Sequence, residues 1–268
     1  MADYIHGYDA EEQVRLVAQA EYWRDLLILR EVDFTQGESV LELGCGVGAV
    51  LGILGQTYPS LKLAGIDLQP TQIDYARQYL STLDLTSVDL QVGDASQLPW
   101  PDESFDQVCT TWFLEHVPRP EPVLKEALRV LKPGGKLSLT EPDYMSITTW
   151  PDSSDYCYLR AGLCDLLTQA GGHPAMGRQL GPLLESVGFS DVQNSAWGYH
   201  FFQTDANADL KEFVTYVDGW LAPTVAQIAE MLGRDIQKLE AGLNFFRQIP
   251  SQPDGAVTVT IFRSLGYK

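Results

Sequence analysis

The spacing of hydrophobic positions changes several times along this chain, and each change predicts a different element. Between residues 11 and 31, apolar side chains recur at helical spacing, which predicts an amphipathic helix. Residues 40–43 are a short apolar run that contains one acidic residue, which is typical of a buried strand. Three glycines, Gly44, Gly46 and Gly48, follow it, and an apolar helical pattern then continues to residue 56. We therefore predict a strand, a tight turn and a helix.

The same alternation continues to residue 143. Further strand-like segments end at residues 66, 92, 111 and 140, and helical patterns cover residues 71–83 and 120–131. Strands that alternate with helices favour a parallel sheet with right-handed crossovers. We therefore predict an α/β fold with helices on both faces of one sheet.

The pattern after residue 143 is less regular. Residues 144–175 contain an aromatic helix, residues 176–187 a further helix and residues 189–202 a strand. A mostly helical stretch then precedes a last strand over residues 256–262. This stretch is too long for a hairpin loop, so we predict a helical insertion over residues 203–252.

These patterns divide the chain into three parts. Residues 1–35 form an N-terminal helical arm, which either packs on the sheet or closes over the ligand site as a lid. The core comprises residues 36–202 and 253–268, with residues 144–175 as a cap segment. The insertion is the third part.

Composition excludes several classes of partner. The 268 residues carry a formal net charge of −18. Binding to nucleic acid or to an anionic membrane surface needs clustered Lys and Arg, so we expect neither. No apolar stretch approaches the roughly 18 residues of a membrane span, and we expect no signal peptide. The four cysteines form no C-x-x-C pair, which favours reduced thiols in a cytoplasmic protein.

The glycine turn is the first candidate for chemistry. Glycines allow a ligand to approach the backbone, and the N–H groups of the following helix then face that ligand. Gly44, Gly46 and Ala49 fit the dinucleotide fingerprint G-x-G-x-x-G/A. Gly44, Gly46 and Gly48 instead fit G-x-G-x-G, which resembles the first motif of class I S-adenosylmethionine-dependent methyltransferases. The turn alone leaves both cofactors open.

Two acidic residues follow the next two strands. Asp67 ends the strand over residues 62–66, where a carboxylate suits hydrogen bonds to ribose hydroxyls, although it could also cap the next helix. Asp94 ends the third strand. It is placed either to accept a hydrogen bond from an adenine amino group or to form an Asx turn.

The order of further motifs decides between the two cofactors. Seven segments occur in sequence, namely Leu41–Gly48, Gly65–Asp67, Gly93–Ala95, Leu98–Pro99, Phe105–Asp106, Leu114–Val117 and Leu131–Gly135. Together they resemble the class I methyltransferases of the ubiquinone/menaquinone-biosynthesis type over residues 38–143, with weaker similarity in residues 183–192. A nicotinamide enzyme has no reason to carry the later segments.

This resemblance implies a fold, a cofactor and a set of site residues. The fold is a Rossmann-like, seven-stranded, mostly parallel sheet with an antiparallel last strand and a helical lid, and the cofactor is S-adenosylmethionine. By resemblance, Asp67 holds the ribose and Leu68 packs beside the adenine, whose edge Asp94 and Ala95 read. The residues implied near the methionine part and the transferring methyl group are Glu42, Gly44, Cys45, Gly46, Gly48, Thr111 and Trp112.

Methyl transfer is an in-line displacement, in which the protein positions the acceptor and excludes water. A general base is needed only if the accepting atom is protonated. The candidate bases are His116, Asp143, His173 and His200, with Tyr144 as an orienting group, and each histidine also has a purely structural alternative. No cluster of His, Asp or Glu has the spacing of metal ligands, so we expect no metal.

Aromatic residues bear on the acceptor. They favour an apolar or aromatic acceptor or an aromatic cage for a cation, although many will belong to the core. The candidates are Tyr4, Tyr8, Trp112, Tyr144, Trp150 and Trp197.

We therefore expect an enzyme that methylates a small, apolar or aromatic acceptor at O, N or C. A catalytically inactive, methyltransferase-like binding protein is one alternative, although the intact glycines and both acidic residues argue against it. An NAD-dependent oxidoreductase is the other. The sequence determines neither the acceptor nor the oligomeric state.

Overall fold

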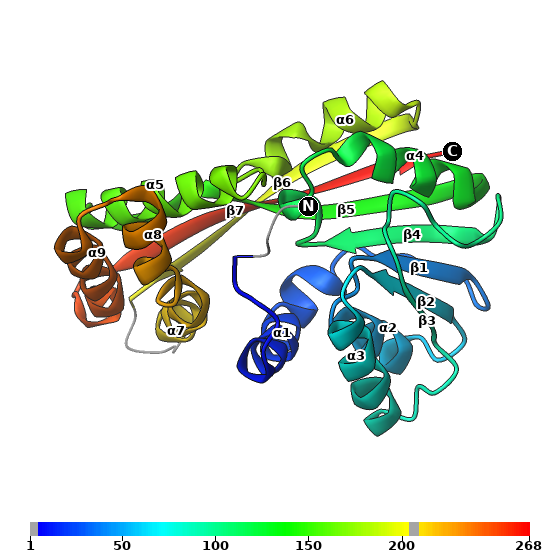
Figure 1. The fold of residues 1–268 in the computed structure, drawn as a ribbon, viewed down its shortest axis with the longest axis horizontal. Helices are drawn as coiled ribbons and strands as arrows, with labels where there is room; N and C mark the ends of the chain where they lie inside the picture. The colour runs from blue at the N-terminus through cyan, green and yellow to red at the C-terminus, as the bar shows by residue number, and fades with distance from the viewer. Residues whose placement is uncertain (1–4, 204–208) are drawn as a thin grey trace.

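A seven-stranded sheet runs through the part of the chain that the computed structural model describes, residues 5–203 and 209–268 (Figure 1). The strand order is β3-β2-β1-β4-β5-β7-β6, and β7 runs antiparallel to both of its neighbours. The other pairs are parallel. This confirms the predicted Rossmann-like sheet. The strands are β1 Ser39–Leu43, β2 Lys62–Asp67, β3 Asp89–Val92, β4 Phe105–Thr111, β5 Leu131–Trp150, β6 Ser190–Phe202 and β7 Ala256–Tyr267.

Helices cover both faces of the first five strands of the chain. Helices α1, α2 and α3 pack through one apolar cluster, and α4 and α6 pack through another on the opposite face. The helices are α1 Ala10–Tyr22, α2 Ala49–Thr57, α3 Pro70–Thr82, α4 Pro120–Val130, α5 Ser154–Gln169, α6 Leu180–Val187, α7 Asp209–Leu221, α8 Thr224–Leu232 and α9 Ile236–Gln248.

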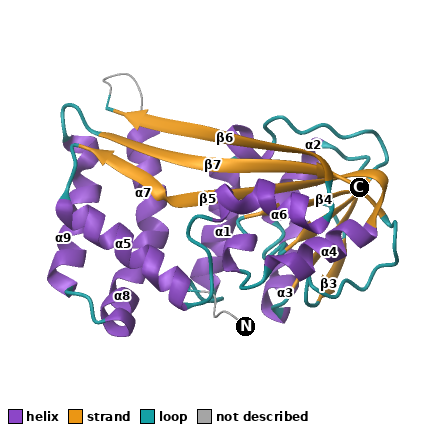
Figure 2. Ribbon diagram, turned by 90° about the horizontal axis from the view of Figure 1, so that it is seen from above, coloured by secondary structure: helices purple, strands orange, loops and turns teal. Residues whose placement is uncertain are grey.

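A third apolar cluster lies beyond this core. Strands β5, β7 and β6 are long, and α5, α7, α8 and α9 pack against one side of their far ends (Figure 2). The fifth strand was expected to end near residue 140 but continues to Trp150. Its last residues, Thr148–Trp150, pair with Thr258–Ala256 of β7. The structure thus places residues 144–150 in the sheet and not in a cap, because β-branched and aromatic side chains favour the extended chain there.

The N-terminal arm is fastened to the last strand. After α1, a π-helical turn η1 (Arg24–Ile28) brings Leu27 next to β7. The buried Arg263 guanidinium donates hydrogen bonds to the carbonyl oxygens of Leu27 (2.7 Å) and Arg30 (2.5 Å). The ring of Trp197 lies between Arg30 and Arg263, 4.2 and 4.8 Å from their guanidinium carbons. These contacts hold the arm in place, although burial lowers the pKa of Arg263 to about 10.

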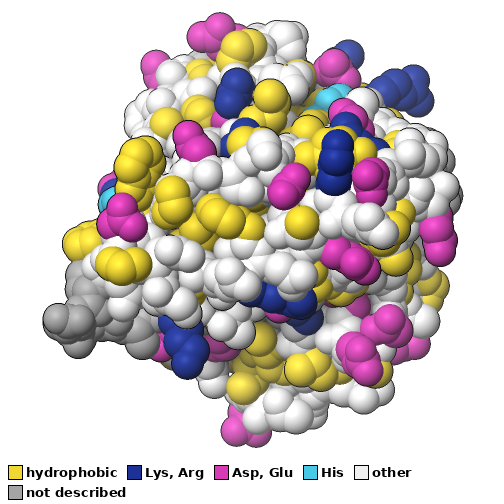
Figure 3. Space-filling model, turned by 90° about the vertical axis from the view of Figure 1, so that its left-hand side faces the viewer, with side chains coloured by type: hydrophobic (Ala, Val, Ile, Leu, Met, Phe, Trp, Pro, Cys, Tyr) yellow, Lys and Arg dark blue, Asp and Glu magenta, His cyan; other side chains and the backbone are white. Residues whose placement is uncertain are grey.

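The helical end of the molecule has a mixed surface. Seen end-on, hydrophobic patches alternate with acidic and basic side chains (Figure 3). Large hydrophobic residues that are exposed in this part of the fold include Trp150, Phe202 and Met231. Within the described ranges, no helix has both the length and the apolar character needed to cross a bilayer.

Candidate active site

A cavity of about 560 Å³ opens at the carboxyl ends of β1, β2 and β4. The order of the sheet reverses between β1 and β4, and ligands of open α/β sheets bind at such a point. The cavity continues past β4 towards α1 and α7, so the arm and the insertion contribute to its walls.

The glycine turn after β1 forms one end of the cavity. Gly44, Gly46 and Gly48 all have positive φ angles, of 67°, 48° and 75°. A Cβ at Gly44 would lie 2.2 Å from the Phe113 ring, whereas one at Gly46 would have no neighbour within 4 Å. Gly44 and Gly46 line the cavity, and the open space beside Gly46 leaves room for a ligand.

Gly48 differs from the other two glycines. It is the N-cap of α2, and a Cβ there would lie 3.1 Å from the Cβ of Ala76 in α3. It does not line the cavity. The expectation of cofactor contact at Gly48 therefore gives way to a role in the turn and in helix packing.

Asp67 combines both roles considered for it. Its Oδ1 accepts a hydrogen bond from the Gln69 N–H and its Oδ2 one from the Gly46 N–H, both at 2.9 Å. It thus ties the glycine turn to the start of α3 and still lines the cavity. Burial raises the pKa of Asp67, although these backbone donors act in the opposite direction. Each oxygen keeps a lone pair for a ligand hydroxyl.

Glu42 of β1 is a buried carboxylate at the same end. Its Oε2 has no hydrogen-bond partner in the described part of the chain. Burial and then the nearby charge of Asp67 raise the pKa of Glu42 well above its usual range. An unpartnered buried oxygen at a cavity suits a ligand with N–H donors. This oxygen thus fits the amino group of S-adenosylmethionine. The open space at Gly46 likewise allows the cofactor to come close to the backbone of the turn.

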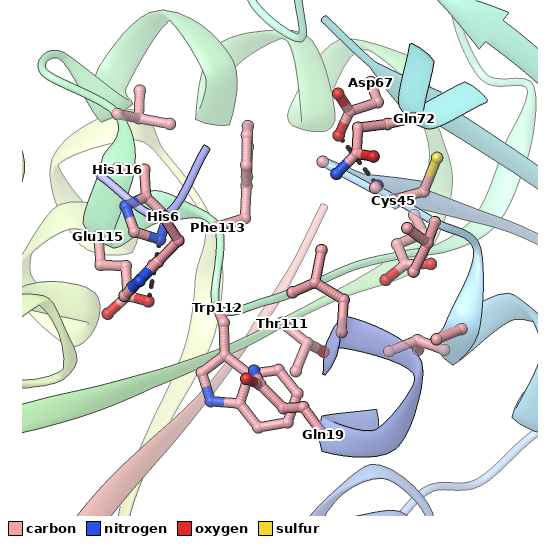
Figure 4. A pocket seen from close by; sticks show the side chains of 18 of the residues that line it. His6, Gln19, Cys45, Asp67, Gln72, Thr111, Trp112, Phe113, Glu115 and His116 are labelled. Atoms are coloured by element: carbon pink, nitrogen blue, oxygen red, sulfur yellow. Dashed lines mark hydrogen bonds and ion pairs between the residues drawn. The ribbon is translucent and has the colours of Figure 1, made fainter. Parts of the chain in front are cut away.

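The remaining residues expected at the cofactor also line the cavity. These are Cys45, Leu68, Asp94, Ala95, Thr111 and Trp112. Asp94 forms the Asx turn that was one alternative, with its Oδ1 accepting from the Ser96 N–H at 2.8 Å. Trp112 has a positive φ of 53°, and its backbone N–H donates to Thr140 of β5 at 3.0 Å. This turn carries the Trp112 ring into the cavity (Figure 4).

Aromatic side chains surround the other end of the cavity. We call this set the aromatic chamber: Trp23, Trp112, Tyr144, Phe213, Tyr216 and Trp220. The Tyr144 and Trp220 rings meet edge to face, with centroids 5.7 Å apart. Three members come from α7, in the predicted insertion. Tyr8 also lines the cavity, but Trp150 and Trp197 do not, and Tyr4 lies outside the described residues.

A short helical turn, η2 (Leu114–His116), places two polar groups beside this chamber. The fully buried Glu141 accepts hydrogen bonds from the backbone N–H groups of Phe113, Leu114 and Glu115, at 3.0, 2.7 and 3.2 Å. Burial, followed by the charge of Glu115, raises the pKa of Glu141 well above its usual range. Glu141 thereby fixes the backbone from which Glu115 and His116 project.

Glu115 is a residue that the sequence reasoning missed. Its side chain is 2 % exposed and lines the cavity. Its Oε1 accepts a hydrogen bond from the Tyr144 hydroxyl at 3.2 Å and lies 3.3 Å from His116 Nε2. Its Oε2 has no partner among the described residues. The available signal was its place in the Leu114–Val117 motif, next to the predicted base His116.

The structure separates the four candidate bases. His116 lines the cavity, as does the orienting residue Tyr144. His173 and His200 do not; His200 is exposed and lies 2.8 Å from Thr258 Oγ1. Asp143 was an incorrect expectation, because its carboxylate accepts a 2.7 Å hydrogen bond from Arg178 outside the cavity. Alternation along β5 points Tyr144 to the cavity and Asp143 to the opposite face.

Among residues 5–203 and 209–268, no group of three or more His, Cys, Asp or Glu side chains is arranged to hold a metal ion. All four cysteines are free, and burial raises the pKa of the Cys45 thiol in the cavity wall.

Comparison with known proteins gives a consistent family. A model described as a methyltransferase domain matches residues 41–139. The ubiquinone/menaquinone biosynthesis C-methyltransferase UbiE of Desulfotalea psychrophila is 32 % identical over 222 residues, or 81 % of each chain. The demethylmenaquinone methyltransferase of Symbiobacterium thermophilum is 32 % identical over 50 % of this chain and 54 % of its own. A 37.1 kDa protein of a Streptomyces fradiae transposon is 37 % identical over 61 % of this chain and 47 % of its own. The matches thus span about half the length of several of these relatives.

Solved structures share the fold. Phosphoethanolamine N-methyltransferase 2 of Haemonchus contortus, in complex with S-adenosyl-L-methionine, is 17 % identical, with a TM-score of 0.58 over 92 % of this chain and 52 % of its own. The [4+2]-cyclase SpnF is 22 % identical, with a TM-score of 0.51 over 95 % and 80 %. At these identities the likeness is one of fold, and the names of the two proteins describe different reactions.

Proposed function

Given that this chain belongs to the class I S-adenosylmethionine-dependent methyltransferases of the ubiquinone/menaquinone-biosynthesis type, we propose that it methylates a small, apolar, aromatic acceptor. The observation that carries this proposal is the continuous cavity that joins the glycine turn and Asp67 to the aromatic chamber. One end suits the cofactor and the other suits a ring, so both reactants fit in one enclosed space.

The cofactor end is assigned residue by residue. When bound, S-adenosylmethionine supplies an activated methyl group together with its own leaving group. We assign the methionine part to Glu42, Gly44, Cys45 and Gly46, because these residues surround the open space of the turn. The ribose is assigned to Asp67. Leu68, Asp94 and Ala95 are assigned to the adenine, and Thr111 and Trp112 to the border with the acceptor.

The acceptor end is assigned by its chemistry. Aromatic side chains pack well against a flat ring and exclude water from the reacting atoms. Two relatives are named for C-methylation in ubiquinone and menaquinone biosynthesis or for methylation of demethylmenaquinone. Those names favour a ring carbon of a quinone-type precursor as the methyl-accepting atom. The four free cysteines support the cytoplasm as the location.

Calorimetry and turnover test this proposal. The protein should bind S-adenosylhomocysteine and not NAD, and it should transfer labelled methyl groups to reduced naphthoquinones or related phenols. Asp67→Ala should weaken the binding of S-adenosylhomocysteine at least about tenfold, or ~1.4 kcal/mol, because the ribose hydroxyls lose the carboxylate that accepts their hydrogen bonds. Unchanged affinity in Asp67→Ala would refute the ribose assignment. Binding of S-adenosylhomocysteine without any methyl transfer would refute the proposed activity.

A further inference from the structure

We infer that Glu115 binds the methyl acceptor through Oε2 and accepts the proton of an acceptor hydroxyl group, with His116 and Tyr144 as its orienting neighbours. This inference rests on the proposed function, since it assigns a residue of the same cavity. It also narrows the acceptor from an apolar ring to a hydroxylated one.

The first step is the unpartnered oxygen. Glu115 lines the cavity, and its buried Oε2 receives no hydrogen bond from the described residues. A buried carboxylate oxygen without a donor is costly, because the water that it lost is not replaced. A donor on a bound ligand would replace that water. A hydroxyl group supplies such a donor.

The second step is that the Glu115 carboxylate is held in one orientation. Glu141 fixes the η2 backbone, and the Tyr144 hydroxyl and His116 Nε2 both meet Oε1, at 3.2 and 3.3 Å. These neighbours leave Oε2 as the oxygen for a ligand. Figure 4 shows Glu115 and His116 on the opposite side of the view from Asp67, with Phe113 between them and Trp112 below. Glu115 therefore lies on the acceptor's side of the cavity.

The surroundings of Glu115 favour a neutral hydroxyl ligand over a positively charged ammonium group. His6 lines the same cavity, and burial lowers its pKa to about 3, helped by the positive charge of Arg15. Surroundings that keep an imidazole neutral also disfavour a cationic ligand, because both must lose hydration. The ionisable groups in this part of the cavity include Glu141, His6, His116, Tyr144, Tyr216 and Arg15. A neutral hydroxyl meets the unpartnered oxygen without adding a charge.

The proton balance is the same for both products. When the acceptor oxygen is methylated, its O–H proton passes to Glu115 as the new C–O bond forms and the sulfur keeps the electron pair of the broken S–C bond. When a neighbouring ring carbon is methylated, the O–H proton passes to Glu115 first. The proton of the methylated ring carbon later moves to the oxygen as the ring regains aromaticity. One proton remains on Glu115 in each case, to be released to water.

A binding experiment tests the hydrogen bond without turnover. With S-adenosylhomocysteine present, the protein should bind 1-naphthol more tightly than 1-methoxynaphthalene, which has no donor. Glu115→Gln should reduce that preference about tenfold, because the charge of the accepting group is lost. Its affinity for S-adenosylhomocysteine should stay unchanged, which also shows that the variant is folded. Glu240→Gln, at an exposed position of α9, is the control and should behave as the parent protein.

Turnover tests the proton transfer. With 1,4-dihydroxynaphthalene kept reduced, Glu115→Gln should lower kcat by at least about 100-fold, the range of general-base catalysis. Glu115→Asp should recover part of the rate.

The outcomes separate the two proposals. If the parent protein turns over hydroxylated aromatics and Glu115→Gln keeps kcat within about threefold, the role of Glu115 in proton transfer is refuted and the proposed function stands. If the naphthol preference is absent from the parent protein, or is equal in Glu115→Gln, the hydrogen bond to the acceptor is refuted. If the parent protein binds S-adenosylhomocysteine but methylates no acceptor, the proposed function fails, and the binding arm still decides whether Glu115 holds a hydroxyl.

Discussion

The cofactor end and the acceptor end of this cavity are built in different ways. At the cofactor end, the glycine turn and the acidic residues come from turns that follow neighbouring strands of the sheet. At the acceptor end, the wall consists of side chains from the arm, β5 and α7, which lie far apart in sequence. Short turns fix a backbone wall locally, whereas a side-chain wall depends on how distant elements pack. The first should tolerate almost no change, and the second should tune the choice of acceptor.

Gly44→Ala should break the cofactor end and have the largest effect. The new Cβ would lie 2.2 Å from the Phe113 ring, on a backbone with φ of 67°. We expect S-adenosylhomocysteine affinity to fall at least about 100-fold in calorimetry, or ~2.7 kcal/mol.

Gly134→Ala is the matched control for Gly44→Ala. Gly134 has a φ of 77°, but a Cβ there has no neighbour within 4 Å. This control should cost about 1–2 kcal/mol of stability from backbone strain and leave the affinity unchanged. An equal loss of affinity in both variants would show that backbone strain, and not the contact of the new Cβ with Phe113, causes the loss in Gly44→Ala.

Trp220→Ala should act at the acceptor end alone. The Trp220 ring is buried in the aromatic chamber against Tyr144, and its loss removes a wall of the acceptor site. We expect the KM for the acceptor to rise about 30-fold, ~2 kcal/mol, while S-adenosylhomocysteine affinity changes less than about twofold. Trp150→Ala, at an exposed tryptophan outside the cavity, is the control and should change neither constant. A parallel loss of both affinities in Trp220→Ala would show that the two ends are not independent.

Glu42→Gln should have the smallest effect. It should weaken cofactor binding but stabilise the folded protein. Burial raises the pKa of Glu42, so its contribution to stability is full below the unfolded pKa and is lost as pH rises towards the folded one. Glu42→Gln should therefore be more stable than the parent protein at pH 8, a difference that should shrink near pH 4. Urea unfolding at both pH values measures this. S-adenosylmethionine affinity should fall about tenfold, because the amide of Gln cannot become a carboxylate partner for the cofactor's amino group. A variant that gained affinity would contradict the assignment.

The same contrast explains how much could be predicted from the sequence. The glycine spacing and the Asp at the end of the second strand are local signals, and the predicted methyl donor and sheet were confirmed. The prediction for Asp143 was wrong because the direction of its side chain depends on where β5 ends. The last residues of β5 are held in the sheet by pairing with β7. Glu115 was missed because its unpartnered oxygen is visible only once Tyr144 and His116 are placed around Oε1. Trp220 was not among the aromatic candidates, because nothing in α7 itself indicates which cavity its ring faces.

The hydrogen bonds from Arg263 to the arm have a consequence for the order in which the protein is made. By residue 112, a growing chain already contains every strand end of the cofactor site. The arm is synthesised even earlier, yet Arg263, which donates hydrogen bonds to its carbonyl oxygens, lies in β7, the last strand of this sheet in chain order. Two parts of the chain that are far apart in sequence thus depend on each other. We expect a nascent chain to complete its reaction chamber only after β7 has been synthesised and has entered between β5 and β6.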